Sequence, residues 1–508
     1  MNNTSNKVIH NTLMLYIRMA FVILVGFYTS RVILNILGVN DFGIYNVVCS
    51  IVLVFYSFNG SLSLATSRFL SLELSQNNFE LLKKIFSVSI VIHWAIAIIV
   101  LIACETLGIW FIEHKLVISP DRLYAAKMAL HLSTLSFMLS LLQLPYYSSI
   151  IAHEDMEIIA YISIAESILK LIMIFLLQNF GKDKLILYSF LMLCISIIIT
   201  LLYYVYSRKK YDETKFVFVK EKSLYKSIFS FFGWNFFENA SLLIHQNGIN
   251  FLQNMFFGVE INAAMGIAIQ VRNNVRTFQG NFIIAVQPHI FKKYTSESIE
   301  NIEKTIISSM KMSYILMAIF VIPMCLEMDY ILKLWLKNPP KYSSEFCIWF
   351  LIYALIFAIT TPLHTAIHAS GKIKTLSLFG GISYLLAIPI AYAFLMKGAA
   401  YNTAVIVSVL FGFIQNILTF IAFKIEMKNT SLFRIIIKSL FPMMVTSIIS
   451  IATIYFIQIN INSPVIVRFL ATIFGGFVAI IVLSYFIILD KNEKQIILSI
   501  IKEKLRIK

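Results

Sequence analysis

Residues 185–206 read LILYSFLMLCISIIITLLYYVY, an unbroken apolar stretch without a charged side chain. A helix rises about 1.5 Å per residue, so about 20 apolar residues cross the roughly 30 Å hydrocarbon core of a bilayer. A strand of a membrane barrel would instead show about 10 residues in which apolar and polar side chains alternate. The stretch therefore predicts a transmembrane helix.

The composition extends this interpretation to the whole chain. Of its 508 residues, 59% are hydrophobic and only 13% are charged, and the mean hydropathy is +0.81. A chain with so few polar groups cannot cover a surface that faces water, which excludes a soluble globular protein. Because every backbone polar group in hydrocarbon needs an internal partner, we expect an all-α polytopic membrane protein.

The charged and Pro- or Asn-rich breaks divide the chain into fourteen predicted transmembrane helices. They span roughly residues 11–37, 42–64, 85–112, 123–151, 157–178, 185–206, 225–257, 260–285, 306–335, 345–369, 375–396, 402–425, 432–457 and 465–489. The divisions between helices are least clear at the short links 38–41 and 258–260.

Lys and Arg divide unevenly between the two sets of alternate loops. One set, which includes the segment 207–224 and the tail after residue 489, carries twenty-four of them, and the other carries eight. The positive-inside rule makes the first set cytoplasmic, with both termini on that side. The net charge of +16 then reflects orientation and contact with anionic membrane lipids, so we expect no nucleic-acid partner.

The loops leave no room for a catalytic domain outside the membrane. We find no Walker loop, dinucleotide fingerprint, GxSxG motif or acidic metal cluster, and the five cysteines are scattered without metal-ligand spacing. We therefore expect no enzyme activity, no catalytic residue, no metal site and no cofactor. Whatever the chain does, it does within the bilayer.

The chain matches itself at an offset of 220 residues. Gly38-Val39 pairs with Gly258-Val259, and at nearby offsets Pro145 pairs with Pro362 and Glu105 with Glu327. We interpret the first six and the next six helices as two copies in the same orientation, with the last two helices added. Chance alignment of hydrophobic sequence is the alternative. The expected division is an N-terminal lobe (1–206), a basic linker (207–224), a C-terminal lobe (225–428) and a segment with the last two helices and a basic tail (429–508).

Polar residues gather on three of the predicted helices. Charged groups in a transmembrane helix usually face protein or water, so we expect these helices to line a hydrated cavity between the lobes. Arginine matches the geometry of phosphate oxygens, which favours an anionic, phosphate-bearing substrate. The alternative is that each Arg pairs with an acid or extends toward the membrane surface. The predicted substrate-binding residues are Arg18, Arg272, Arg276, Asn235, Asn239, Gln246, Asn250 and Asn273.

Glu238 and two histidines are further candidates. Glu238 flanks the polar stripe of the predicted helix 225–257 and could bind H⁺ or Na⁺ as a coupling ion, although a hydrogen bond between helices is an equal alternative. His364 and His368 lie four residues apart, but no Glu follows the first of them, so we interpret them as packing residues rather than zinc ligands.

Residues 29–45, TSRVILNILGVNDFGIY, resemble the first helical hairpin of Wzx-type polysaccharide flippases. These belong to the multidrug/oligosaccharidyl-lipid/polysaccharide (MOP) exporter superfamily, and the duplication and helix count extend the resemblance over nearly the whole chain. The resemblance implies a monomeric transporter of the bacterial inner membrane, made of two six-helix lobes around a cavity that opens alternately to each side.

The same resemblance implies a substrate and partners. The substrate would be an undecaprenyl-pyrophosphate-linked oligosaccharide for O-antigen, lipopolysaccharide or capsule, moved from the cytoplasmic to the periplasmic leaflet with coupling to a cation gradient. Arg18 and Arg272 or Arg276 would bind the pyrophosphate, and the last two helices would hold the lipid tail. Membrane lipids and other polysaccharide assembly proteins would be the partners.

Two other functions remain open. A multidrug/cation antiporter of the same superfamily would be expected to carry buried acids, whereas the deep charges here are mainly arginines. A membrane-embedded polysaccharide polymerase or acyltransferase would be expected to carry a long periplasmic loop or a catalytic acid/His group, and neither is evident.

Overall fold

The computed structural model is helical throughout and contains no strand in the residues that it describes. These are residues 2–114, 116, 118–179, 183–296, 298–461, 465–491 and 493–495. The predicted all-α membrane fold is therefore confirmed. Residues 115, 117 and 180–182, which lie in predicted loops, and most of the predicted basic tail lie outside the described residues.

The chain divides into two compact units, each described here by itself. The N-terminal unit is Ile9–Phe236, and the C-terminal unit is Phe237–Lys508 together with Met1–Val8. The first contains α1 (Asn2–Leu53) from Ile9 onward, α2 (Ser57–Ser75), α3 (Phe79–Ala103), α4 (Ile109–His114), α5 (Leu123–Leu142), α6 (Leu144–Ala152), α7 (Met156–Asn179), α8 (Lys184–Lys210) and the start of α9 (Lys222–Ser296). The second contains the rest of α9, α10 (Ile299–Leu326), α11 (Met328–Leu336), α12 (Ser343–Ser370), α13 (Lys374–Met396), α14 (Thr403–Glu426), α15 (Leu432–Ile435), α16 (Phe441–Asn460) and α17 (Val465–Leu483).

The same glycine conformation interrupts α1 and α9. Gly38 has φ 74° and ψ 169°, and Gly258 has φ 79° and ψ −166°. These values lie in a region that is essentially restricted to glycine. Each glycine divides a long helix into two arms, which correspond to the predicted pairs 11–37 and 42–64, and 225–257 and 260–285. The two glycines are one of the pairs on which the internal duplication rests.

Outside α1 and α9, ten helical segments of the described residues are long and apolar enough to cross a membrane. They correspond to the other ten predicted spans, but several boundaries were wrong. The second predicted span extends through α2 to Ser75, and the eighth extends to Ser296. The predicted helix 123–151 is divided at Gln143 into α5 and α6, because Pro145 has no N–H with which to continue the hydrogen-bond ladder.

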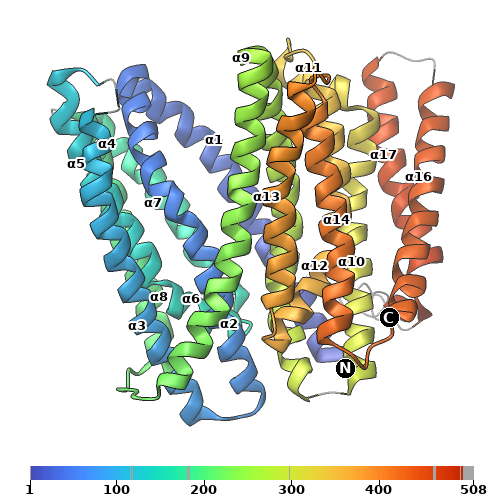
Figure 1. Ribbon diagram of the computed structural model, residues 1–508, viewed down its shortest axis with the longest axis horizontal. Coiled ribbons are helices and arrows are strands. Elements are labelled where there is room, and N and C mark those ends of the chain that lie inside the picture. Colours follow the sequence, from blue (N-terminus) through green and yellow to red (C-terminus); the bar gives the residue numbers. More distant parts are fainter. Residues whose placement is uncertain are drawn as a thin grey trace. The chain divides into compact units, whose positions relative to one another are not determined.

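The two units repeat one packing pattern. In the N-terminal unit α3 packs against α5, α5 against α8, and α7 against α8. In the C-terminal unit α10 packs against α12, α12 against α14, and α13 against α14 (Figure 1). These helices correspond one to one under the offset of about 220 residues. In addition, α16 and α17 pack against each other and against α10.

The segment after α8 is attached to the N-terminal unit. Its Val217 amide donates to Ser87 Oγ of α3 at 2.9 Å, and Lys84 of α3 forms an ion pair with Glu221 at 2.9 Å. Glu213 accepts hydrogen bonds from His153 Nε2 at 2.7 Å and Ser149 Oγ at 2.9 Å. The predicted basic linker is therefore held against one unit over part of its length.

Candidate functional site

Arg272 and Arg276 lie one turn apart on the second arm of α9 and form what we call the arginine pair. Arg272 is only 3% exposed, and its Nε and Nη2 donate to Asn273 Oδ1 at 3.3 and 3.2 Å. Among the described residues neither arginine forms an ion pair with an acid. In the described residues these two arginines are therefore not neutralised by carboxylates, which was the alternative for them.

Aromatic rings surround the arginine pair instead. The Arg272 guanidinium lies 5.1 Å from the ring centre of Phe350, and that of Arg276 lies 4.4 Å from Phe357, both on α12. A ring face attracts a cation, but far less strongly than a carboxylate does. The pair therefore keeps most of its positive charge available to an anion.

Tyr353, Tyr384 and His245 complete the surroundings of Arg272. The two phenol oxygens lie 3.4 Å apart, and the His245 ring stacks on Tyr384 at 5.6 Å between centres. Neither His245 nitrogen has a hydrogen-bond partner. The hydroxyls and the imidazole interact electrostatically with Arg272, so hydrogen-bonding groups lie beside the cation without cancelling its charge.

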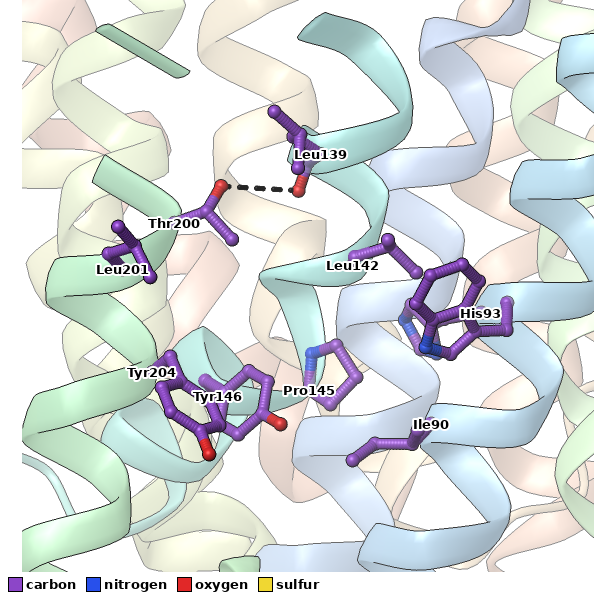
Figure 2. Close-up of a pocket in the computed structure, with 10 residues that line it drawn as sticks. Ile90, His93, Leu139, Leu142, Pro145, Tyr146, Thr200, Leu201 and Tyr204 are labelled. Carbon is purple, nitrogen blue, oxygen red and sulfur yellow. Dashed lines mark hydrogen bonds between the residues drawn. The ribbon is translucent and has the colours of Figure 1, made fainter. Parts of the chain in front are cut away.

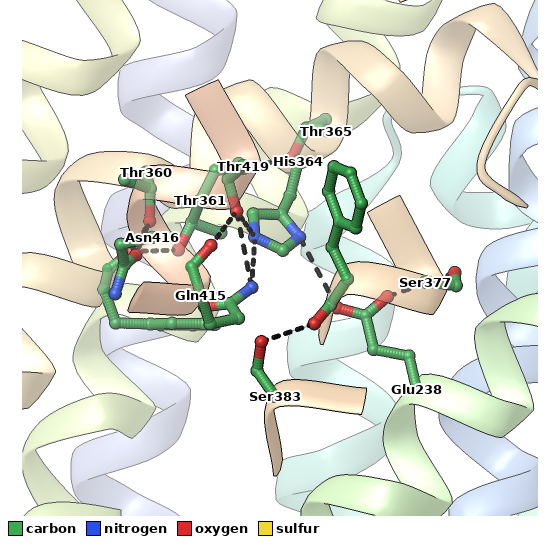
Figure 3. Close-up of polar contacts among 12 residues, drawn as sticks. Glu238, Thr360, Thr361, His364, Thr365, Ser377, Ser383, Gln415, Asn416 and Thr419 are labelled. Carbon is green, nitrogen blue, oxygen red and sulfur yellow. Dashed lines mark hydrogen bonds and ion pairs between the residues drawn. The ribbon is translucent and has the colours of Figure 1, made fainter. Parts of the chain in front are cut away.

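A second group, the carboxylate network, lies in the same unit (Figure 3). Glu238 of α9 accepts a hydrogen bond from Ser377 Oγ of α13 at 3.2 Å, and its Oε1 lies 3.9 Å from His364 Nδ1 of α12. The distance to the imidazole is too long for a hydrogen bond. Gly380 permits this position, because a Cβ there would lie 2.7 Å from Glu238 Oε1.

The far side of His364 is held by α14. Gln415 Nε2 donates to His364 Nε2 at 3.2 Å, and Thr419 Oγ1 lies 3.0 Å from the same nitrogen. An amide nitrogen only donates, so His364 Nε2 accepts and Nδ1 carries the proton that faces Glu238. His364 is therefore more than the packing residue that we expected from the sequence.

The arginine pair and the carboxylate network are connected. Phe357, which lies under Arg276, is 6.0 Å from the His364 ring, and Tyr384 interacts electrostatically with both Arg276 and Glu238. The two groups therefore share Phe357 and Tyr384 as neighbours. Among the described residues no group of three or more His, Cys, Asp or Glu could hold a metal ion.

The remaining predicted residues fall in both units. In the C-terminal unit Asn239, Gln246 and Asn250 are half-buried, Asn273 is exposed, and the buried Asn250 Oδ1 has no partner. Arg18 and Asn235 belong to the N-terminal unit, where Asn235 is 4% exposed. The half-buried Arg18 interacts electrostatically with Tyr147 and Tyr203, and its Nε has no hydrogen-bond partner.

Sequence reasoning missed the partners that α12, α13 and α14 contribute. Gln415, Asn416 and Thr419 interrupt the otherwise apolar helix 402–425, which is a signal that the helix-by-helix search for charged residues passed over. Asn416 pairs with Thr360, so all three have partners on α12.

The chain resembles known proteins in part of its sequence and in its fold. Residues 15–176 match the MatE family model. The fold is similar to that of a MATE transporter in the bent conformation, with a TM-score of 0.75, 11% identity, and coverage of 84% of this chain and 96% of that one. No curated protein matches the chain in sequence.

Two other solved structures are similar to the same extent. One is an outward-facing multidrug resistance MATE family transporter of the MOP superfamily, with a TM-score of 0.72, 11% identity, and coverage of 84% of this chain and 97% of that one. The other is a MOP superfamily transporter from Pyrococcus furiosus, with a TM-score of 0.73, 10% identity, and coverage of 84% and 96%. Its description reports a binding pocket of reversed polarity that suggests a different function. The chain thus has the fold of MATE transporters.

Proposed function

We propose that this protein is a flippase that moves a pyrophosphate-linked amphiphile, of the lipid-linked oligosaccharide class, across the bacterial inner membrane by alternating access. The observation that carries the proposal is the arginine pair, a buried Arg272 one turn from Arg276 without an acidic partner among the described residues. A buried, unpaired charge is costly, so its retention favours a role in binding.

A diphosphate suits this pair for a geometric reason. Residues four apart on a helix lie on the same face, so two guanidinium groups can bind neighbouring phosphates. Hydroxyls and amides near the pair, such as Tyr353, Tyr384 and Asn273, can hydrogen-bond a sugar. The polar head group would then cross in contact with polar side chains rather than hydrocarbon.

We propose Glu238 as the site that couples transport to a cation gradient, with H⁺ or Na⁺ as the ion. Binding of a cation would remove a negative charge that the arginine pair senses through Tyr384 and Phe357. Binding of the cation and of the anionic substrate would therefore influence each other, as coupled transport requires.

The second candidate is a multidrug/cation antiporter. It is favoured by the same half-buried Glu238, whose described contacts include no Lys or Arg, and by the likeness of the fold to a multidrug resistance MATE transporter. The two candidates predict opposite charge preferences for the substrate.

Binding by purified protein separates them. Farnesyl pyrophosphate, farnesol and tetraphenylphosphonium would be titrated against wild-type protein and against R272Q, R276Q and R272K. We expect the pyrophosphate to bind best and R272Q or R276Q to weaken its binding about tenfold or more, because a charge-assisted hydrogen bond contributes about 1.5–3 kcal/mol. R272K, which keeps the charge, should lose less.

Stability provides the matched control. R272Q removes a buried unpaired charge, so the variant should unfold at the same temperature as wild type or higher even though it binds less pyrophosphate.

Tight binding of tetraphenylphosphonium that is lost in E238Q, with no pyrophosphate binding, would favour the antiporter. In cells, deletion in a capsule-producing host should leave lipid-linked repeat units on the cytoplasmic face of the inner membrane.

A further inference from the structure

The N-terminal unit contains a cavity of about 300 Å³, whereas the arginine pair and the carboxylate network belong to the C-terminal unit. We call it the lateral crevice. It is lined from α3, α5, α6 and α8 (Figure 2). Its lining residues are Ile90, His93, Trp94, Leu139, Leu142, Pro145, Tyr146, Thr200, Leu201 and Tyr204.

The rim of the crevice is apolar and exposed. Trp94 is 47% exposed, Leu201 is 52% exposed, and Ile98 and Ile197 continue exposed apolar rows along α3 and α8. In a membrane protein such side chains face hydrocarbon, so the crevice opens toward the bilayer. A molecule that enters it would come from the membrane rather than from water.

The inner wall carries an unsatisfied hydrogen-bond acceptor. His93 is 1% exposed, and its Nδ1 lies 2.6 Å from the carbonyl oxygen of Ser89. Because a carbonyl only accepts, Nδ1 carries the proton, and Nε2 of the neutral ring is left as an acceptor. Nε2 is buried and has no partner. A buried polar atom without a hydrogen bond is costly, so the site favours an occupant that donates one.

The C-terminal unit fills the corresponding place with part of its own chain. Trp94 of α3 and Tyr314 of α10 are related by the offset of 220 residues, yet Tyr314 is only 1% exposed. Its hydroxyl lies 2.6 Å from Ser447 Oγ of α16, a helix that has no counterpart within the duplicated part of the N-terminal unit. In the C-terminal unit the apolar helix α16, with its Ser447 hydroxyl, therefore covers the position at which the N-terminal unit has the lateral crevice.

We propose that the lateral crevice binds a membrane amphiphile that has one hydroxyl donor on an otherwise apolar body, with that hydroxyl donating to His93 Nε2. The volume suits a chain segment or a small ring system rather than a protein helix, whose diameter with side chains is about 10 Å. Tyr146 and Tyr204 lie opposite His93 and pack against the apolar body (Figure 2). The proposal does not depend on what the protein transports.

A matched pair of photoactivatable probes tests this. One is a long-chain alkanol with a diazirine in its chain, and the other is its methyl ether, which has the same chain but no hydroxyl donor. Each would be irradiated with wild-type protein in lipid nanodiscs, and labelled residues would be located by mass spectrometry. We expect the alkanol to label α3 and α8 around the crevice several-fold more than the ether does.

Two variants make the result decisive. H93F keeps a ring of similar size but removes the acceptor, so the preference for the alkanol should disappear. L201W fills the rim, so labelling of this variant by both probes should fall. It tests the crevice independently if H93F does not fold. H114F, in which an exposed histidine outside the crevice is changed, should label as wild type does. Equal labelling of the wild type by the two probes would overturn the proposal. No labelling at the crevice would also overturn it, and is the result expected if Nε2 binds only water.

Discussion

Arg122 binds Asp41 through two nitrogens of its guanidinium group, and the same group also holds Asp183. Nε donates to Asp41 Oδ1 at 2.9 Å, Nη2 donates to Asp41 Oδ2, and Nη1 donates to Asp183 Oδ2 at 2.7 Å. The three side chains join the second arm of α1, the turn before α5 and the start of α8. One cation thus connects three parts of the N-terminal unit.

We expect R122Q to destabilise the N-terminal unit by about 1–3 kcal/mol, because two partly buried carboxylates would lose their partner. R122K should recover only part of this, since an ammonium group cannot reproduce the two-nitrogen contact. Thermal unfolding in detergent measures both. K127Q, which breaks the neighbouring and more exposed pair with Glu113, is the control and should change stability by less than about 1 kcal/mol.

Gly38 and Gly258 should not tolerate alanine. No atom lies within 4 Å of a Cβ built on either residue, so the penalty comes from backbone conformation alone. We expect G38A and G258A each to cost about 1–3 kcal/mol. Gly43, five residues beyond Gly38, is helical and equally unobstructed, so G43A should be neutral or slightly stabilising in the same assay. Equal effects of G38A and G43A would contradict the argument.

The attachment of the segment after α8 should weaken in acid. Burial alone would raise the pKa of the Glu213 carboxyl, but hydrogen bonds from His153 and Ser149 outweigh burial and hold the pKa below its usual value of 4.5. The stabilisation is therefore complete above about pH 4.5 and is lost as the pH falls through the lowered pKa.

The difference in unfolding temperature between wild type and E213Q measures this effect. It should be largest near neutral pH and should shrink as the pH falls below about 4.5. D212N alters an adjacent, exposed carboxylate and should show almost no difference from wild type at any pH. A difference for E213Q that does not change with pH would count against the role of the ionised carboxylate.

E238Q should separate substrate binding from coupling. The variant keeps the hydrogen bond to Ser377 but cannot take up a cation, so we expect pyrophosphate binding to persist while its dependence on the coupling ion is lost. Binding titrations over a range of pH and Na⁺ concentration provide the measurement. S377A, which removes only the donor to Glu238, is the control and should keep the ion dependence. If E238Q responds to the ion as wild type does, coupling lies elsewhere.

Hydropathy predicted most of the fold because each span must be apolar over its own length. The breaks at Gly38 and Gly258 were also predictable, since both lie at short links between apolar runs. The extension of α2 to Ser75 and of α9 to Ser296 was missed. Helix propensity continues past the end of the hydrocarbon, and hydropathy does not report where it stops.

The candidate site could also be predicted only in part from the sequence. The spacing of Arg272 and Arg276 on one helix was visible in the sequence, because it depends on a single helical period. The contact of His364 with Glu238 and Gln415 was not, because it depends on how α9, α12 and α14 pack. Residues more than a hundred positions apart meet there, and no local pattern encodes their approach.

The extra pair of helices gives the two units different neighbours. α10 is covered by α16 and α17, whereas the corresponding helix α3 leaves Trp94 and Ile98 to the surrounding lipid. Changes in acyl-chain length or fluidity therefore act directly on α3, but reach the corresponding helix α10 through α16 and α17. The bilayer is thus an unequal environment for two helices that the duplication makes equivalent, and the lipid chosen for reconstitution will affect α3 and α10 differently.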